Sequence, residues 1–124
     1  MKTATFNPNG GPIIAEVTPG SAAVGSYTIL LWEANANLVV MRRDGNFINT
    51  ADDAYTLPEP NEHNDGRIVE CIATVVITPP VDTYNVDLVI RQDGNEIGGD
   101  SASGSDASGT VTVDLFVQLN GGGA

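Results

Sequence analysis

The residues of this chain best suited to chemistry lie in one polar connection, residues 49–66, which holds five acidic residues and the only histidine, His63. A histidine beside an acid can act as the general base for a serine or cysteine nucleophile in a hydrolase. The sequence contains no Gly-x-Ser-x-Gly turn, which exposes the nucleophilic serine in many hydrolases. A small hydrolase built around His63 is therefore the weakest hypothesis for the function, and a solvated loop histidine is the simpler interpretation.

The same connection offers carboxylate oxygens, which are the ligands that calcium prefers in proteins. If the connection folds back on itself, five carboxylates would converge on one ion: Asp52, Asp53, Glu59, Glu62 and Asp65. Their spacing does not follow the EF-hand loop, which ends on a glutamate at its twelfth position. A zinc site is excluded because the chain has one histidine and one cysteine. We therefore expect no cofactor, with a calcium-dependent binding module as the alternative.

Three aromatic side chains are the candidate ligand-binding residues: Trp32, Tyr55 and Phe116. Aromatic rings bury a large apolar area and anchor many binding surfaces. Phe116 falls among the polar positions of its stretch, and Trp32 belongs to a stretch with apolar residues at both parities. Outward rings of this kind line a covered second core, a subunit interface or a ligand-binding face. The sequence leaves these three alternatives open.

The charge of the chain excludes two classes of partner. Sixteen acidic residues against five basic ones give a formal net charge of -11, and a surface of that sign repels nucleic-acid phosphates and anionic lipid headgroups. We therefore expect neither nucleic-acid nor membrane binding. The N-terminal residues lack the apolar core of a signal peptide. This predicts a cytoplasmic protein as the chain stands, or an extracellular one if a leader or flanking domains were removed.

Three long stretches between residues 67 and 119 alternate apolar and polar side chains, and they are the strongest structural signal in the sequence. In the last stretch, the apolar side chains on one parity are Val111, Val113, Leu115, Val117 and Leu119. Successive side chains of a strand point to opposite faces, so the pattern predicts an antiparallel sheet with one buried face. Cys71 shares a parity with apolar neighbours and is predicted to lie in the core. As the only cysteine, it can form no disulfide within the chain.

The 124 residues fit one domain, which we place at residues 12–119, between a flexible lead-in (1–11) and a flexible tail (120–124). The predicted strands cover residues 13–17, 27–33, 38–42, 54–57, 67–78, 83–92 and 110–119. Asp-Gly-Asn sequences at 44–46 and 93–95 predict two hairpins of the same build, because Asp-Gly favours the type I′ turn. Residues 98–109, rich in glycine and serine, are predicted to form a mobile linker.

These elements predict an all-β fold: a single Greek-key β-sandwich, immunoglobulin-like or jelly-roll, of about seven or eight mostly antiparallel strands. The sequence assembles no catalytic set of residues, whereas loops on a rigid sandwich are common recognition surfaces. We therefore predict a non-catalytic binding, adhesion or assembly module that recognises protein or carbohydrate through its loops, chiefly residues 49–66 and 98–109. Trp32, Phe116 and the exposed edges of an open sandwich also predict self-association into a homo-oligomer.

Overall fold

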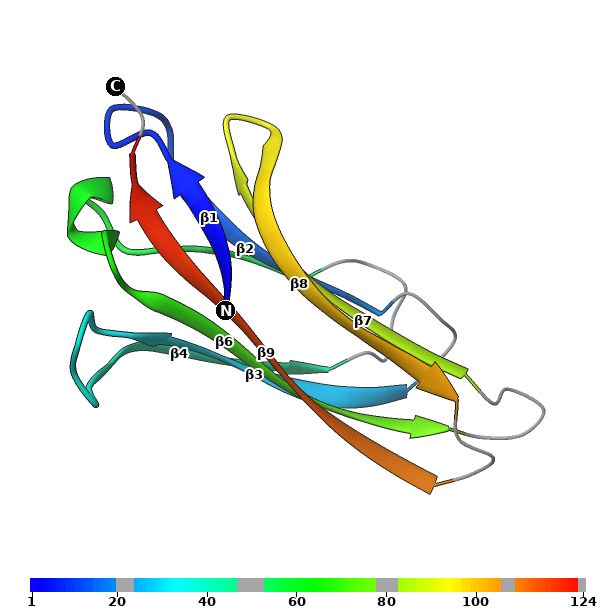
Figure 1. Cartoon of the computed structure of the whole chain (residues 1–124). Helices are drawn as coiled ribbons and strands as arrows, with labels where there is room; N and C mark the ends of the chain where they lie inside the picture. Colours follow the sequence, from blue (N-terminus) through cyan, green and yellow to red (C-terminus); the bar gives the residue numbers. More distant parts are fainter. Residues whose placement is uncertain (20–23, 47–52, 78–82, 106–108, 123–124) are drawn as a thin grey trace.

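The computed structural model describes residues 1–19, 24–46, 53–77, 83–105 and 109–122, and shows two packed β-sheets with one core between them (Figure 1). The strands in chain order are β1 (Lys2–Phe6), β2 (Ile13–Pro19), β3 (Val24–Trp32), β4 (Val39–Asn46), β5 (Asp53–Thr56), β6 (Ile68–Ile77), β7 (Thr83–Gln92), β8 (Asn95–Ser105) and β9 (Gly109–Gly121). The five-stranded sheet has the order β1-β9-β6-β3-β4, and the four-stranded sheet has the order β5-β2-β7-β8. The prediction of an all-β fold with two packed sheets is confirmed.

The strands pair antiparallel in both sheets except at one edge of the five-stranded sheet, where β1 runs parallel to β9. Two pairs of successive strands, β3–β4 and β7–β8, are neighbours in the same sheet. The other connections cross from one sheet to the other. Within the described residues, the helical structure is a single 3-10 turn, η1 (Asn61–Asn64). No helix in this part of the chain is long and apolar enough to cross a membrane.

The core between the two sheets is built from the predicted alternation of side chains. In β9, Val113, Leu115 and Val117 are 8, 2 and 0% exposed, so this parity faces the core as expected. The matching parity of β6 is also buried, and it includes Cys71 at 0% exposure. Burial raises the pKa of the Cys71 thiol to about 12, so the thiol stays neutral and behaves as a small apolar core residue.

The prediction of a flexible lead-in over residues 1–11 is wrong, because β1 lies within it. Ala4 and Phe6 of β1 are each 1% exposed and belong to the core. Phe6 pairs with Gly121, so β9 also extends into the predicted flexible tail. A strand of five residues is too short to show a clear periodicity. Its partner lies at the other end of the chain, where no local signal could indicate it.

The two Asp-Gly-Asn sequences adopt different structures. Residues 93–95 form the predicted tight hairpin between β7 and β8, with φ of 54° at Asp93 and 79° at Gly94. Residues 44–46 instead lie inside β4, where Gly45 pairs with Tyr27 of β3, so the prediction of a hairpin there is wrong. The pairing of β4 with β3 decides the difference. This pairing requires glycine at position 45, because a Cβ atom there would collide with the Tyr27 ring and hydroxyl.

The prediction of a mobile linker over residues 98–109 is also wrong for most of its length, since β8 continues to Ser105 and residues 106–108 lie outside the described residues. Its glycines permit close packing of the backbone. A Cβ atom on Gly98 would lie 2.6 Å from the Thr3 backbone oxygen, and one on Gly99 would lie 2.6 Å from the Leu88 backbone oxygen. Small residues therefore allow β8 to pass close to β1 and β7.

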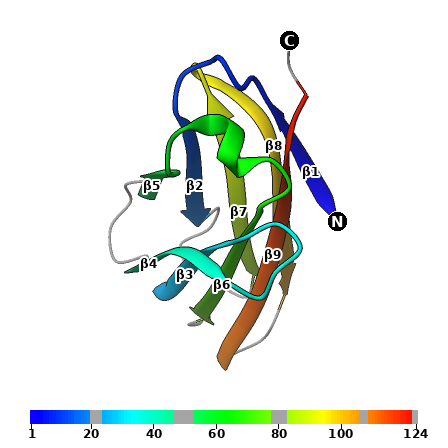
Figure 2. The same cartoon turned by 90° about the vertical axis from the view of Figure 1, so that its left-hand side faces the viewer.

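One end of the sandwich is covered by η1, as the view along the layers shows (Figure 2). Buried amide side chains tie η1 to the chain around it. Asn61 Nδ2 donates to the carbonyl oxygens of Gly10 and Gly11 at 3.1 and 2.9 Å, and Asn64 Nδ2 donates to the Pro58 carbonyl at 2.9 Å. The second half of the acidic connection is therefore packed against the sheets through its own hydrogen bonds.

Replacing Phe6 by Ala tests whether β1 belongs to the core. Phe6 is almost fully buried, so Phe6→Ala should destabilise the fold by about 3–5 kcal/mol, the usual cost of such a truncation in a packed core. Phe116→Ala is a matched control that should cost less, because Phe116 is only partly buried. Urea unfolding followed by circular dichroism measures both changes. Wild-type stability in Phe6→Ala would contradict the assignment of β1.

Replacing the glycine of each Asp-Gly-Asn sequence by alanine should destabilise the fold for a different reason in each case. Gly94→Ala should destabilise by about 1 kcal/mol, because its positive φ strains any residue with a Cβ atom. Gly45→Ala should displace Tyr27, whose hydroxyl donates a hydrogen bond to Asp53. Near-ultraviolet circular dichroism should therefore change in Gly45→Ala and stay unchanged in Gly94→Ala. The same spectrum in both variants would argue against two different structures.

Candidate functional site

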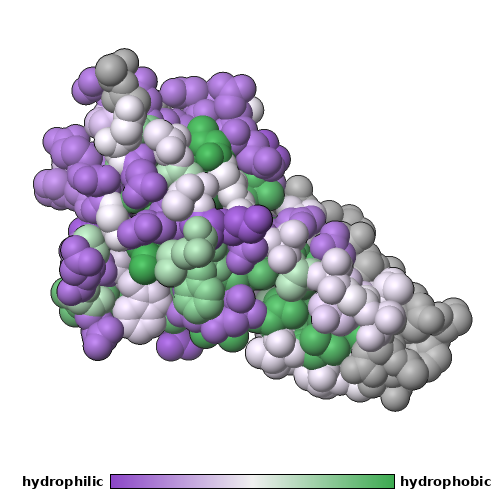
Figure 3. Space-filling model, viewed as in Figure 1, coloured by the Kyte–Doolittle hydropathy of each residue, from purple (hydrophilic) through white to green (hydrophobic). Residues whose placement is uncertain are grey.

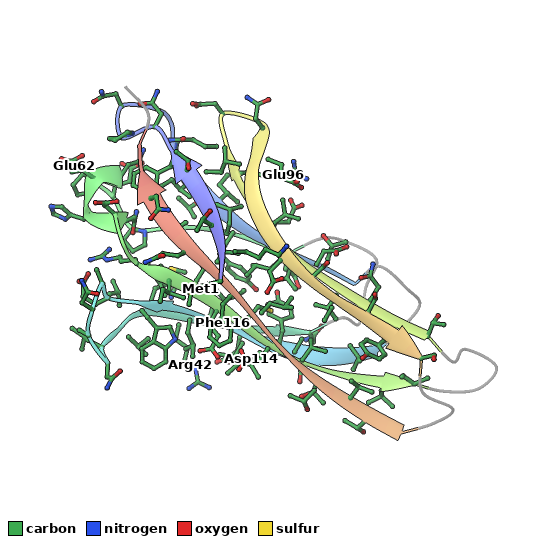
Figure 4. All side chains as sticks on the ribbon, viewed as in Figure 1. Met1, Arg42, Glu62, Glu96, Asp114 and Phe116 are labelled. Atoms are coloured by element: carbon green, nitrogen blue, oxygen red, sulfur yellow. The ribbon has the colours of Figure 1, made fainter. Side chains whose placement is uncertain are left out.

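A hollow of about 440 Å³ lies on the outer face of the five-stranded sheet, opposite the core. Trp32 of β3 and Phe116 of β9 line it, together with Glu70 of β6, Gln118 of β9 and Met1. Figure 3 shows apolar residues across the middle of this side of the molecule, bordered by hydrophilic ones, and Figure 4 shows Met1 and Phe116 close together there. Two of the three predicted aromatic residues therefore meet in one place.

The strand register explains why these side chains meet. Leu30, Glu70 and Phe116 align across β3, β6 and β9, and Trp32 aligns with Ile68 in the next outward row. Alternate residues of a strand share one face, and the residues between these positions belong to the core. All five side chains consequently lie on the outward face of the sheet.

The β3–β4 turn forms one rim of the hollow and is held by an ion pair. Arg67 donates from Nε and Nη2 to the two carboxylate oxygens of Glu33 at 3.1 and 3.0 Å. These hydrogen bonds from Arg67, with one from the Ala34 amide, lower the pKa of the Glu33 carboxyl. A forked contact of this kind restrains both partners. It fixes the turn directly after Trp32 against the start of β6.

Glu70 is the unusual residue of the hollow, because it is only 7% exposed although it lies on an outward face. Its Oε1 accepts a hydrogen bond of 2.9 Å from the indole Nε1 of Trp32. A buried carboxyl is costly unless it is hydrogen-bonded or neutralised. The contact therefore stabilises Glu70 and orients the Trp32 ring at the same time.

Asp114 of β9 lies diagonally across from Glu70 and shares a hydrogen bond with it. Desolvation, and after it the hydrogen bond with Glu70 and the charge of Glu70, together raise the pKa of the Asp114 carboxyl to about 6. Two neighbouring carboxyls that share a proton titrate as a pair. The Asp114 carboxyl consequently holds its proton in mildly acidic solution and loses it above that range.

Tyr55, the third predicted aromatic residue, lies outside the hollow, in β5 of the four-stranded sheet. Its ring packs edge-on against Tyr27 with centroids 6.2 Å apart, and the two hydroxyl groups are hydrogen-bonded. Tyr27 also donates to Asp53. These contacts join the two sheets, and they account for both Tyr55 and Asp53 as structural residues.

The predicted calcium ligands are not brought together in the part of the chain that the structure describes. Asp65 accepts a hydrogen bond of 2.8 Å from the Gly121 amide, while Glu59 and Glu62 are exposed. Asp52 lies outside the described residues. Within the described ranges, no three His, Cys, Asp or Glu side chains gather in a way that could hold a metal ion.

His63, the centre of the hydrolase hypothesis, lies in η1 with its side chain exposed. No contact that the structure describes joins its ring to a nucleophile. The second hollow of the molecule, about 420 Å³, lies against β8 and includes Lys2, Glu96 and Asp100. Its lining holds no aromatic residue. The outer-face hollow of Trp32 and Phe116 is therefore the better candidate site.

Sequence reasoning missed Glu70, Asp114 and Met1. One signal for Glu70 was present, since it is the only charged residue in the apolar run of β6. Asp114 occupies an ordinary polar position in the alternating pattern of its strand, so the sequence did not mark it as a site residue. Met1 was assigned to a flexible lead-in, and only the pairing of β1 with β9 places it beside Phe116.

Comparisons of the chain with protein-family models, with curated proteins and with solved structures find no match. The geometry and chemistry of the hollow are therefore the basis for assigning a function.

The Glu70–Asp114 pair should make stability depend on pH. Folding raises the pKa of Asp114 from 3.8 to about 6, so its stabilising effect is complete below the lower value and is lost as the pH rises through about 6. We expect the difference in Tm between wild type and Asp114→Asn to shrink or reverse between pH 5 and 7.5. Glu62→Gln, an exposed acid of η1, is the control and should follow wild type. A pH-independent difference would contradict the shared proton.

Proposed function

We propose that this chain is a non-catalytic recognition module that binds a protein or carbohydrate ligand in the hollow of Trp32 and Phe116. The observation that carries the proposal is the arrangement of two partly buried aromatic rings around a buried carboxyl. Binding sites commonly combine apolar walls with a few placed polar groups that orient the ligand. The proposed site differs from the loops expected from the sequence, because it lies on a sheet face and one hairpin turn.

The hollow offers three kinds of contact to a ligand. Trp32 and Phe116 offer apolar ring surface, Asn35, Asn37 and Gln118 offer amide donors and acceptors, and Glu70 offers a carboxylate. The strands and the Glu33–Arg67 ion pair hold these groups in place. Binding a ligand therefore costs little conformational entropy in these side chains.

A protein ligand is favoured over a carbohydrate by the apolar surface beside the hollow. Met1 is 75% exposed, and Leu38 and Val39 at the start of β4 are 60 and 39% exposed. Exposed apolar residues on the rims of a hollow favour contact with the apolar side chains of a protein. The charge of -11 favours a basic partner and opposes close contact between two copies of the chain. Self-association, adhesion and assembly stay predictions.

The assignment of the fold to a Greek-key sandwich of immunoglobulin-like or jelly-roll type also stays a prediction. The crossing of the chain between sheets at most connections supports it. The parallel pair of β1 and β9 is the feature that such an assignment has to accommodate.

Selection of ligands with a hollow variant tests the proposed function. Wild type and Phe116→Ser are each presented to a peptide-display library and a glycan array. We expect wild type to retain ligands that Phe116→Ser loses, because the variant removes one aromatic wall. Val76→Ser, which removes an exposed apolar residue near the far end of β6, is the control and should bind like wild type. Ligands that bind all three proteins equally, or no ligands at all, would contradict the proposal.

A further inference from the structure

We propose that the hollow accepts an arginine side chain of a partner protein, with its guanidinium group between Trp32 and Phe116 and against the carboxyl of Glu70, which is hydrogen-bonded to Asp114 beside the hollow. This inference rests on the proposed recognition function and names the group that is recognised. Three features support it: the ion pairs of the chain, the aromatic walls of the hollow and the surface around it.

No lysine or arginine among the described residues of the chain forms an ion pair with Glu70 or Asp114. The ion pairs among the described residues are Arg42–Asp44, Arg67–Glu33 and Arg91–Glu16. Neither Glu70 nor Asp114 takes part in one of them. Their described hydrogen bonds come from the neutral Trp32 indole and from each other.

The remaining basic side chains of the chain are also placed elsewhere. Arg43 donates from Nη1 to the Arg42 carbonyl at 2.8 Å, and Lys2 lines the second hollow. The chain has five lysine and arginine residues in total. None of these five described residues forms an ion pair with Glu70 or Asp114. A cationic side chain at the Glu70 carboxyl would therefore come from another molecule.

The walls of the hollow suit a planar cation. A guanidinium group stacks on aromatic faces and is attracted to them, and its five N–H groups can reach two carboxylates at once. Trp32 and Phe116 stand on β3 and β9, and Glu70 lies on β6 between these strands. A lysine ammonium offers neither the flat surface nor the fork, so arginine fits this arrangement better.

Other charged groups around the hollow set the conditions for binding. Met1 lies at its edge, Glu33 at the turn is paired with Arg67, and Arg42 of β4 is paired with Asp44. The paired groups largely cancel, so the local charge depends on Glu70 and Asp114. When Asp114 loses its proton above about pH 6, the negative charge beside Glu70 and the attraction for a cation increase.

The partner would therefore be a protein segment in which apolar residues flank an arginine. The arginine would enter the hollow, and its apolar neighbours would contact the exposed side chain of Met1 at the border. The acidic surface of the chain would attract such a basic segment over a longer range, and added salt would weaken that attraction.

The test uses the full chain and the single tryptophan as the reporter, since the indole N–H of Trp32 is hydrogen-bonded to Glu70. The indole signal in ¹⁵N-resolved NMR is followed during titration with N-acetyl-arginine amide. N-acetyl-citrulline amide, which has nearly the same shape but no charge, is titrated in parallel. At pH 7.5 and low salt, we expect the arginine derivative to bind roughly tenfold more tightly, as charge-assisted hydrogen bonds imply.

Variants of the two carboxyls complete the test. Glu70→Gln should remove most of the preference for arginine over citrulline, and Glu62→Gln, the exposed control, should keep it. Asp114→Asn leaves the Trp32–Glu70 hydrogen bond in place, so it remains informative if Glu70→Gln folds poorly. It should abolish the increase in arginine affinity that wild type shows between pH 5 and 7.5.

Equal binding of the two derivatives, or an arginine preference that survives in both carboxyl variants, would overturn the inference. The proposed recognition function is separate from this result. Peptides or glycans that require Phe116 but contain no basic group would leave that function standing and would reject the arginine site. Failure to select any Phe116-dependent ligand, together with equal binding of arginine and citrulline, would reject both.

Discussion

β6 lies in the middle of the five-stranded sheet, and the core and the candidate site meet at this strand. Its inward side chains, among them Val69, Cys71 and Val75, fill the space between the sheets, while outward Glu70 is almost fully buried. A carboxyl in its middle is therefore tolerated only with hydrogen bonds or a proton. The Trp32 indole and the Asp114 carboxyl supply them, so the residues that stabilise β6 also form the hollow.

The border of the hollow depends on contacts between distant parts of the chain. The pairing of β1 with β9 brings Met1 beside Phe116, although these residues lie at opposite ends of the sequence. Asp100 of β8 accepts a hydrogen bond of 3.1 Å from the Phe116 amide, which restrains that part of the sheet edge. Glu33 and Arg67 hold the opposite rim. The hollow is thus supported by strands and ion pairs instead of a free loop.

The acidic residues of this chain divide into groups with different roles. Asp53 and Asp65 accept hydrogen bonds from Tyr27 and from the Gly121 amide, and so they support the fold. Glu16, Glu33 and Asp44 are paired with arginines. Glu70 and Asp114 have only each other and a neutral donor. The overall charge alone did not separate these groups, because a count of acids contains no information about their partners.

The sequence by itself determined which side chains face the core, because a strand alternates its faces wherever the chain folds as β-structure. It therefore predicted the inward parity of β6, β7 and β9, the buried Cys71 and the outward Trp32 and Phe116. Tertiary structure decided what depends on partners far away in the chain. It placed residues 44–46 in a strand and residues 93–95 in a hairpin, although both read Asp-Gly-Asn. It also made strands of β1 and β8, and it set Glu70 beside Asp114. Such pairings arise from contacts across the sheets, which local sequence does not encode.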